Sequence, residues 1–140
     1  MTDEDEDGRG ALGRVTAHRL AVELMDAAAG DAESIVESPA YTVVAAQLLG
    51  AVGSIAARIS EGYVRRSHAD RARYYEYAHG SAEEARDWYR QARRRIPAAA
   101  RRARNNTLTS ICRLLTTMIR NERREDGTHD DEHTNENDPS

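Results

Sequence analysis

The 140-residue sequence predicts an all-α protein, an up-down antiparallel four-helix bundle with disordered acidic tails. Apolar residues recur every three or four positions in four successive segments, which is the spacing of amphipathic helices. No segment shows the strict alternation that predicts a half-buried strand. Short connections between long helices make neighbours antiparallel. A chain of this length has room for one compact domain, and residues 11–124 are predicted to form it.

The first helix is expected over residues 12–36. Gly30 and Asp31 are poor helix formers, so they predict a weak point or kink in it. Its apolar face comprises Leu20, Leu24, Ala28, Ala32 and Ile35.

The second helix is expected over residues 39–60, because Ser38 suits an N-cap and Pro39 suits the first helical position. Glu61 and Gly62 are predicted to end it, with the glycine in a left-handed cap. Its large apolar residues are Val44, Leu48, Val52, Ile55 and Ile59. A second stripe of small residues predicts close approach of a neighbouring helix and comprises Ala46, Gly50, Gly53 and Ala57.

The third and fourth helices are expected over residues 67–95 and 98–123, on either side of Pro97, which interrupts helices. Ser67 with Asp70 three residues later approximates a capping box at the start of the third helix. The apolar seam of the third helix comprises Tyr75, Ala78, Ala82, Ala85, Tyr89, Ala92 and Ile96. The seam of the fourth comprises Leu108, Ile111, Leu115 and Met118.

Residues 40–57 carry no charge and reach the minimum length of a membrane span. Their large apolar residues share one stripe, which favours a buried helix of a soluble protein over a membrane span. The acidic N-terminus does not resemble a signal peptide, which begins with basic residues.

The net charge of −4 is unevenly distributed along the chain. Residues 1–10 have a net charge of −4, residues 125–140 have −7, and the segment between them has +7. Both acidic ends lack the apolar residues that offset the entropy of ordering, which predicts disorder. We also derive the hypothesis that these tails compete for the basic surface of the same chain.

Arginine supplies all 20 basic residues, and eight of them fall within residues 86–104 against one acid, Asp87. Guanidinium groups bind phosphate in a planar fork, so this rim predicts contact with a nucleic-acid backbone. A solvated basic face is the alternative. The arginines predicted to bind are Arg86, Arg90, Arg93, Arg94, Arg101, Arg102 and Arg104.

Tyr77 and Trp88 lie on a second line of the third helix, away from the apolar seam. They either cover an adjacent helix of the same chain or form a subunit interface, where Tyr and Trp are enriched. The interface is favoured because large aromatic side chains are costly to leave exposed.

No catalytic constellation, metal site or cofactor site is predicted, and the protein is not expected to be an enzyme. Glu76 and His79 form an E-x-x-H pattern, but di-iron bundles need a second copy, which the sequence lacks. Cys112 is expected to be a small buried residue. His129 and His133 are interpreted as part of an acidic tail rather than as metal ligands. A metal-dependent bundle enzyme is kept as a remote option.

The middle of the chain carries a pattern of residues that continues from the second helix into the third. The matching residues are Gln47, Leu48, Ser54, Ile55, Ile59, Glu61, Gly62, Arg65, Arg73, Ala78, Gly80, Ser81 and Glu84. They resemble the bacterial four-helix bundle family that is also named for intervening sequences in 23S ribosomal RNA genes. The chain departs from that pattern at Arg58, Ser60 and Val64, where the family has asparagine, alanine and glycine.

The resemblance implies a cytoplasmic bundle, commonly a homopentameric ring, with no known enzymatic activity. A relative, the accessory variability determinant protein of diversity-generating retroelements, binds nucleic acid and its reverse transcriptase. The expected function is therefore a non-enzymatic, oligomeric accessory protein that binds RNA or DNA through its arginine-rich rim. The alternative is a protein-interaction scaffold whose rim docks an acidic partner, such as a reverse transcriptase.

Overall fold

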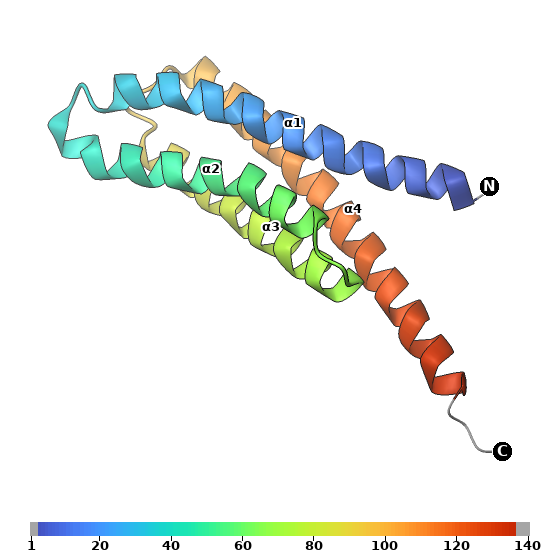
Figure 1. Ribbon diagram of the computed structural model, residues 1–140. Helices are drawn as coiled ribbons and strands as arrows, with labels where there is room; N and C mark the ends of the chain where they lie inside the picture. Colours follow the sequence, from blue (N-terminus) through green and yellow to red (C-terminus); the bar gives the residue numbers. More distant parts are fainter. Residues whose placement is uncertain (1–2, 137–140) are drawn as a thin grey trace.

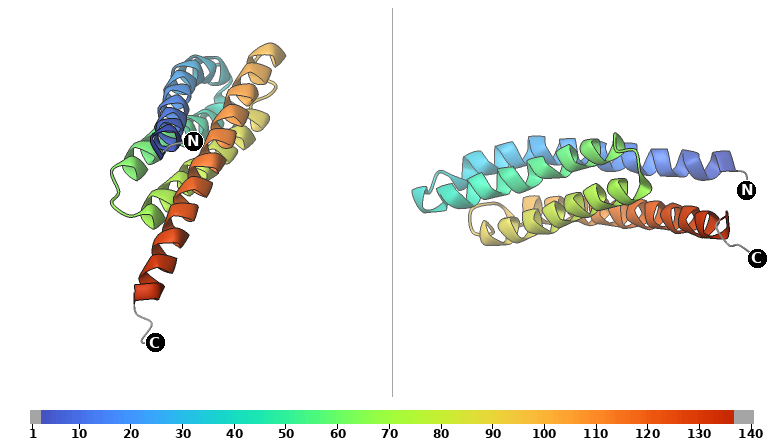
Figure 2. Two further views of the ribbon diagram at one scale, coloured as in Figure 1. Left: turned by 90° about the vertical axis from the view of Figure 1, so that its right-hand side faces the viewer. Right: turned by 60° about the horizontal axis from the view of Figure 1, so that its bottom comes forward.

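In the computed structural model, the chain forms α1 (Asp3–Ile35), a 3-10 turn η1 (Pro39–Tyr41), α2 (Thr42–Tyr63), α3 (His68–Gln91) and α4 (Ala98–Glu136). The structure describes the backbone of residues 3–136 and the side chains of residues 10–127. The α1–α2 and α3–α4 connections lie at one end, and the α2–α3 connection lies at the other (Figure 1). Each helix packs against its neighbours around the bundle (Figure 2). The predicted all-α four-helix bundle is confirmed.

The core consists of the predicted apolar faces, in which alanine is unusually frequent. Every residue predicted for the seams of the third and fourth helices is buried, while Leu20 and Val44 pack against the core at its margin. Tyr89 is the largest fully buried side chain. Small residues beside large ones allow the helices to interdigitate at high density.

The stripe of small residues on α2 does not face another helix of the chain, so this prediction is wrong. Ala46, Gly50 and Ala57 are exposed, and a Cβ atom added at Gly50 or Gly53 would meet nothing within 4 Å. α2 is buried instead through Leu48, Val52 and their partners on the large apolar face. An uncharged face of α2 is therefore open to solvent.

The prediction that Gly62 adopts a left-handed cap is also wrong. α2 continues to Tyr63, and no glycine among the described residues has a positive φ. A Cβ atom at Gly62 would lie 2.8 Å from Cε1 of Tyr75 and 3.0 Å from Cβ of Tyr74. Glycine is required here because α3 approaches the last turn of α2 closely.

We expect Gly62→Ala to destabilise the protein by about 1–2 kcal/mol, since overpacking outweighs the better helix propensity of alanine. Gly30→Ala is the matched control on α1, where an added Cβ meets nothing within 4 Å. That variant should stabilise the protein by up to about 1 kcal/mol. Urea unfolding followed by circular dichroism measures both, and two shifts of the same sign would contradict the packing argument.

The helix starts agree with the sequence better than the helix ends. The Ser67 hydroxyl accepts a hydrogen bond from the Asp70 amide at 3.0 Å, which confirms the predicted cap. Ser38 makes no such bond, and Pro39 begins η1 rather than α2 itself. α3 ends at Gln91, four residues before the predicted end, and the chain then turns before α4 begins.

The two segments predicted to be disordered tails are residues 1–10 and 125–140, and helical backbone covers their described parts, residues 3–10 and 125–136. α1 begins at Asp3 and α4 ends at Glu136, so the predicted domain boundaries do not coincide with helix ends. Propagating an existing helix costs little, and acidic residues favour a helix N-terminus such as that of α1. Residues 1–2 and 137–140 lie outside the described residues.

These acidic segments extend from the end of the bundle opposite to the α3–α4 connection (Figure 1). The arginine-rich segment around that connection therefore lies at the other end of the bundle from residues 3–10 and 125–136 (Figure 1). The hypothesis that the tails compete for the basic surface of the same chain stays a prediction.

One helix of the described residues, Pro39–Tyr63, is long and apolar enough to cross a membrane by length and composition. A core helix of a soluble protein can meet the same criteria. Here the large apolar stripe of α2 is buried against α1 and α3, as expected for a bundle helix.

Candidate functional site

The predicted arginine rim surrounds the α3–α4 connection. Arg86 and Arg90 lie on α3, Arg93 and Arg94 lie in the connection, and the remaining three lie on α4. The local sequence determines this arrangement, since Ala92 and Ile96 are buried while Arg93 and Arg94 between them are exposed. Pro97 then precedes the first residue of α4.

Four arginines of the rim, which we call the open rim, have no side-chain hydrogen bond or ion pair with any residue that the structure describes: Arg90, Arg94, Arg101 and Arg102. All are exposed except Arg101, which is half-buried. The first turn of α4 contains no acidic residue. Its free amide groups and helix dipole therefore add to the positive potential of the open rim.

The other three predicted arginines have intramolecular partners. Arg86 donates to the Thr109 hydroxyl at 3.3 Å and lies 3.7 Å from a Glu83 carboxylate oxygen. Arg93 donates to the backbone carbonyl of Arg90 at 3.0 Å and so closes the end of α3. Arg104 is bound to a buried carboxylate. These contacts give the three residues structural roles.

Asp31 joins three helices through its buried carboxylate. Its Oδ2 atom accepts from Arg104 Nε at 2.8 Å and from the Tyr89 hydroxyl at 2.7 Å, and Oδ1 accepts from Arg104 Nη2 at 3.2 Å. Burial, reinforced by the hydrogen bond to Asp31, raises the pKa of Tyr89. The hydrogen bond to Asp31 likewise raises the pKa of Arg104.

This role of Asp31 was not predicted, although its position in the sequence carries a signal for it. Asp31 is spaced three residues after Ala28 and four before Ile35, so it falls on the apolar face of α1. A lone acid on such a face needs a buried partner.

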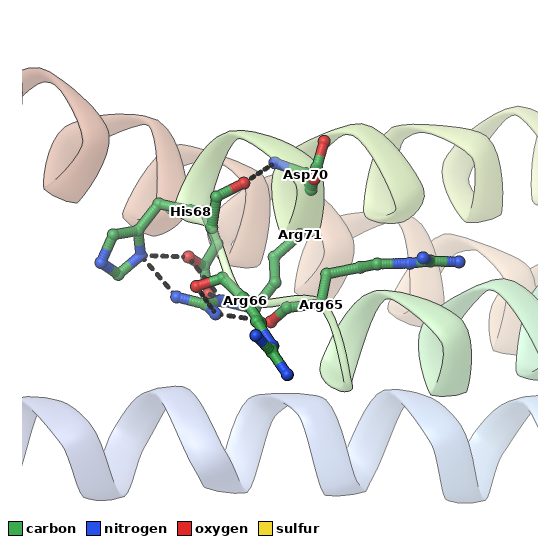
Figure 3. Close-up of polar contacts among 7 residues, drawn as sticks. Arg65, Arg66, His68, Asp70 and Arg71 are labelled. Atoms are coloured by element: carbon green, nitrogen blue, oxygen red, sulfur yellow. Dashed lines mark hydrogen bonds and ion pairs between the residues drawn. The ribbon is translucent and has the colours of Figure 1, made fainter.

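A second polar cluster holds the α2–α3 connection (Figure 3). Arg71 donates to the backbone carbonyls of Arg65 and Arg66 at 2.8 and 3.2 Å, and to Glu122 of α4 at 3.1 Å. Glu122 also contacts Nδ1 of His68 at 2.6 Å. The Arg66 side chain has no dashed contact in the view (Figure 3). The cluster fixes the connection to α4.

Three residues of the family resemblance, Glu61, Gly62 and Arg65, lie at or beside the same connection. Glu61 accepts from Arg58 at 3.1 Å. The Arg65 guanidinium lies 4.4 Å from the ring centroid of Tyr74 and donates to its hydroxyl at 2.8 Å. Gly62 allows α3 to pack closely against the last turn of α2. These contacts give this part of the motif a structural role.

Gly80 and Ser81, two further residues of the family resemblance, lie on α3. Gly80 is exposed, and an added Cβ would meet nothing within 4 Å. Ser81 is half-buried. Gly80 has no side chain, and the Ser81 hydroxyl makes no hydrogen bond among the described residues, so no contact explains the place of either residue in the resemblance.

Tyr77 and Trp88, the predicted interface residues, have different surroundings. Tyr77 is 49% exposed and packs edge-to-face on Tyr74, with centroids 5.6 Å apart. Trp88 is half-buried against the core of its own chain and donates to Glu84 at 3.3 Å. Packing within the chain thus explains the position of Trp88. The half-exposed ring of Tyr77 is still free to contact another subunit. The subunit interface stays a prediction.

The E-x-x-H pattern of Glu76 and His79 does not form a paired site. Glu76 accepts from Arg123 at 2.7 Å, while His79 lies near Glu83 and Cys112. The Cys112 thiol donates to Glu83 at 3.3 Å, and burial raises its pKa to about 11. The side chains of His129 and His133, the other histidines considered, lie outside the described residues.

Comparison with known proteins shows the family of the chain and a similar solved structure. The chain matches the family described as 23S rRNA-intervening sequence protein over residues 16–121. It is similar to a crystal structure of a protein of unknown function from the S23 ribosomal protein family of Bacteroides thetaiotaomicron. The identity is 25%, the TM-score is 0.69, and the match covers 74% of this chain and 97% of that chain. No curated protein matches.

Proposed function

We propose that this chain, which belongs to the 23S rRNA-intervening sequence protein family, is a non-enzymatic accessory protein that binds the phosphate backbone of RNA or DNA. Neither the family nor the structural relative is described as an enzyme. The observation that carries the proposal is the open rim, whose four guanidinium groups have no carboxylate partner among the described residues.

The chemistry of the open rim suits phosphate better than bases. Guanidinium groups donate in pairs to phosphate oxygens, and the N-terminal amides of α4 add donors of the same kind. Contacts to phosphate position a nucleic acid without reading its sequence, so we expect sequence-tolerant binding. The names of the family and of the structural relative refer to ribosomal RNA and to the ribosome. RNA is therefore the first nucleic acid to test.

Fluorescence anisotropy of the full chain with a single-stranded RNA across a salt series tests the proposal. Each phosphate neutralised contributes roughly 0.7 to the log–log slope, so four contacts per chain give a slope near −3. Absence of binding at low salt would overturn it. That result would favour the alternative, a scaffold whose rim docks an acidic protein such as a reverse transcriptase.

We further propose a cytoplasmic homo-oligomer, most simply the pentamer that the family resemblance implies. Two features support self-association: the half-exposed ring of Tyr77 and the exposed, uncharged face of α2, which includes Val43 and Leu49. Large apolar patches on a protein surface are typical of interaction sites.

We expect Tyr77→Arg to reduce the oligomer to smaller species, because a charge buried between subunits loses its hydration. Light scattering after size-exclusion chromatography measures the mass. Val64→Arg is the control, since Val64 is 71% exposed but lies in the α2–α3 connection. An unchanged mass for Tyr77→Arg would exclude Tyr77 from the interface.

A further inference from the structure

We propose that His79, Glu83 and Cys112 form a binding site for a divalent transition-metal ion such as Zn²⁺ between α3 and α4. The site offers one imidazole nitrogen, one carboxylate oxygen and the sulfur, all within 4.8 Å of one another. His79 and Glu83 are one helical turn apart, so they share a face of α3. Cys112 faces them from α4, where its thiol already contacts Glu83 at 3.3 Å.

The three side chains are of the types that bind zinc in proteins, and the separation of the sulfur and the carboxylate oxygen also suits zinc. Zinc takes Cys, His and carboxylate ligands at about 2.0–2.3 Å, so tetrahedral ligand atoms are roughly 3.3–3.7 Å apart. The sulfur–oxygen distance already has this value, and side-chain rotations upon binding would bring the nitrogen, which lies within 4.8 Å of both atoms, into the set. His79 also lines a groove of about 270 Å³ with Glu76, Thr116 and Ile119, which gives a water molecule access to the fourth position.

The charged groups around the site include some that favour binding of a divalent cation and one that opposes it. When sulfur bonds to the metal, the thiol proton leaves to solvent, and the resulting thiolate and carboxylate neutralise the dication. The Arg86 guanidinium, 3.7 Å from Glu83, opposes the added positive charge. It also bonds to Thr109, so it keeps a partner when Glu83 turns toward the metal. A bound ion would join α3 to α4.

Cobalt substitution of the full chain tests the site directly. The background variant carries His129→Gln and His133→Gln, which removes the tail histidines as competing ligands. Addition of Co²⁺ should produce a saturable near-ultraviolet band of sulfur-to-cobalt charge transfer, and Zn²⁺ should displace it. We expect Cys112→Ser to abolish the band and His79→Gln to weaken Co²⁺ binding at least about tenfold. Arg86→Gln should strengthen binding, because it removes the opposing charge.

His18→Gln is the matched control, since His18 is a half-buried histidine on α1 outside the site. Circular dichroism confirms that each variant is folded. The proposal is overturned if no charge-transfer band appears at millimolar Co²⁺. It is equally overturned if the band survives Cys112→Ser, or if His79→Gln binds as tightly as His18→Gln.

Discussion

Replacement of Asp31 by alanine is expected to lower the free energy of unfolding by about 3 kcal/mol, the effect of removing one partner from a buried ion pair. Asp31 is only 8% exposed and accepts hydrogen bonds from α3 and α4. Without the carboxylate, the fully buried Tyr89 hydroxyl has no acceptor and Arg104 has no counter-ion. An unsatisfied buried polar group retains its full desolvation penalty.

Chemical denaturation of Asp31→Ala beside Glu33→Ala measures this effect, since Glu33 is an exposed acid on the same helix. The control should change stability by no more than about 0.5 kcal/mol. The double variant Asp31→Ala, Arg104→Met should lose less than the sum of its single variants, because it leaves no unpaired charge. Strict additivity would mean that the ion pair contributes nothing of its own.

The sequence predicts the core well because burial depends on a local property. A residue such as Leu48 is buried whenever the apolar face of its helix meets any neighbour, and helical spacing alone defines that face. The same argument places Tyr89 and Leu115 correctly without knowledge of which helices touch.

The prediction for the stripe of small residues on α2 was wrong because helical spacing identifies a face of a helix but not the neighbour that covers it. Spacing shows that Gly50 and Gly53 share a face, but only the packed bundle shows that no helix of this chain covers it. At Gly62 the sequence suggests a glycine needed for a turn, but the structure shows a glycine needed for close packing against the ring of Tyr75.

The partners of the charged residues depend on the register between helices, which spacing within one helix does not contain. Arg102 and Arg104 are two positions apart and therefore point about 200° apart around α4. One is exposed at the open rim, and the other reaches Asp31, 73 residues earlier in the chain. The approach of Cys112 to His79 depends on the same inter-helical register.

Neutralising the open rim is expected to weaken RNA binding by roughly 10²–10³-fold at 0.1 M salt, if each arginine neutralises one phosphate. The variant replaces Arg90, Arg94, Arg101 and Arg102 with glutamine. None of the four side chains forms a hydrogen bond or ion pair with a described residue, so the fold should keep its stability. The log–log salt slope should also approach zero, since the contacts that release counter-ions are gone. Anisotropy across a salt series measures both quantities.

The charge-matched control decides whether position or net charge causes the loss. It replaces four exposed arginines away from the rim with glutamine: Arg66, Arg73, Arg113 and Arg120. Both variants change the net charge equally, so a non-specific attraction would weaken both to the same extent. If the open rim contacts the phosphates, the salt slope of RNA binding falls sharply in the open-rim variant and changes little in the control variant. Equal slopes in the two variants would therefore contradict the assignment of the rim as the binding surface.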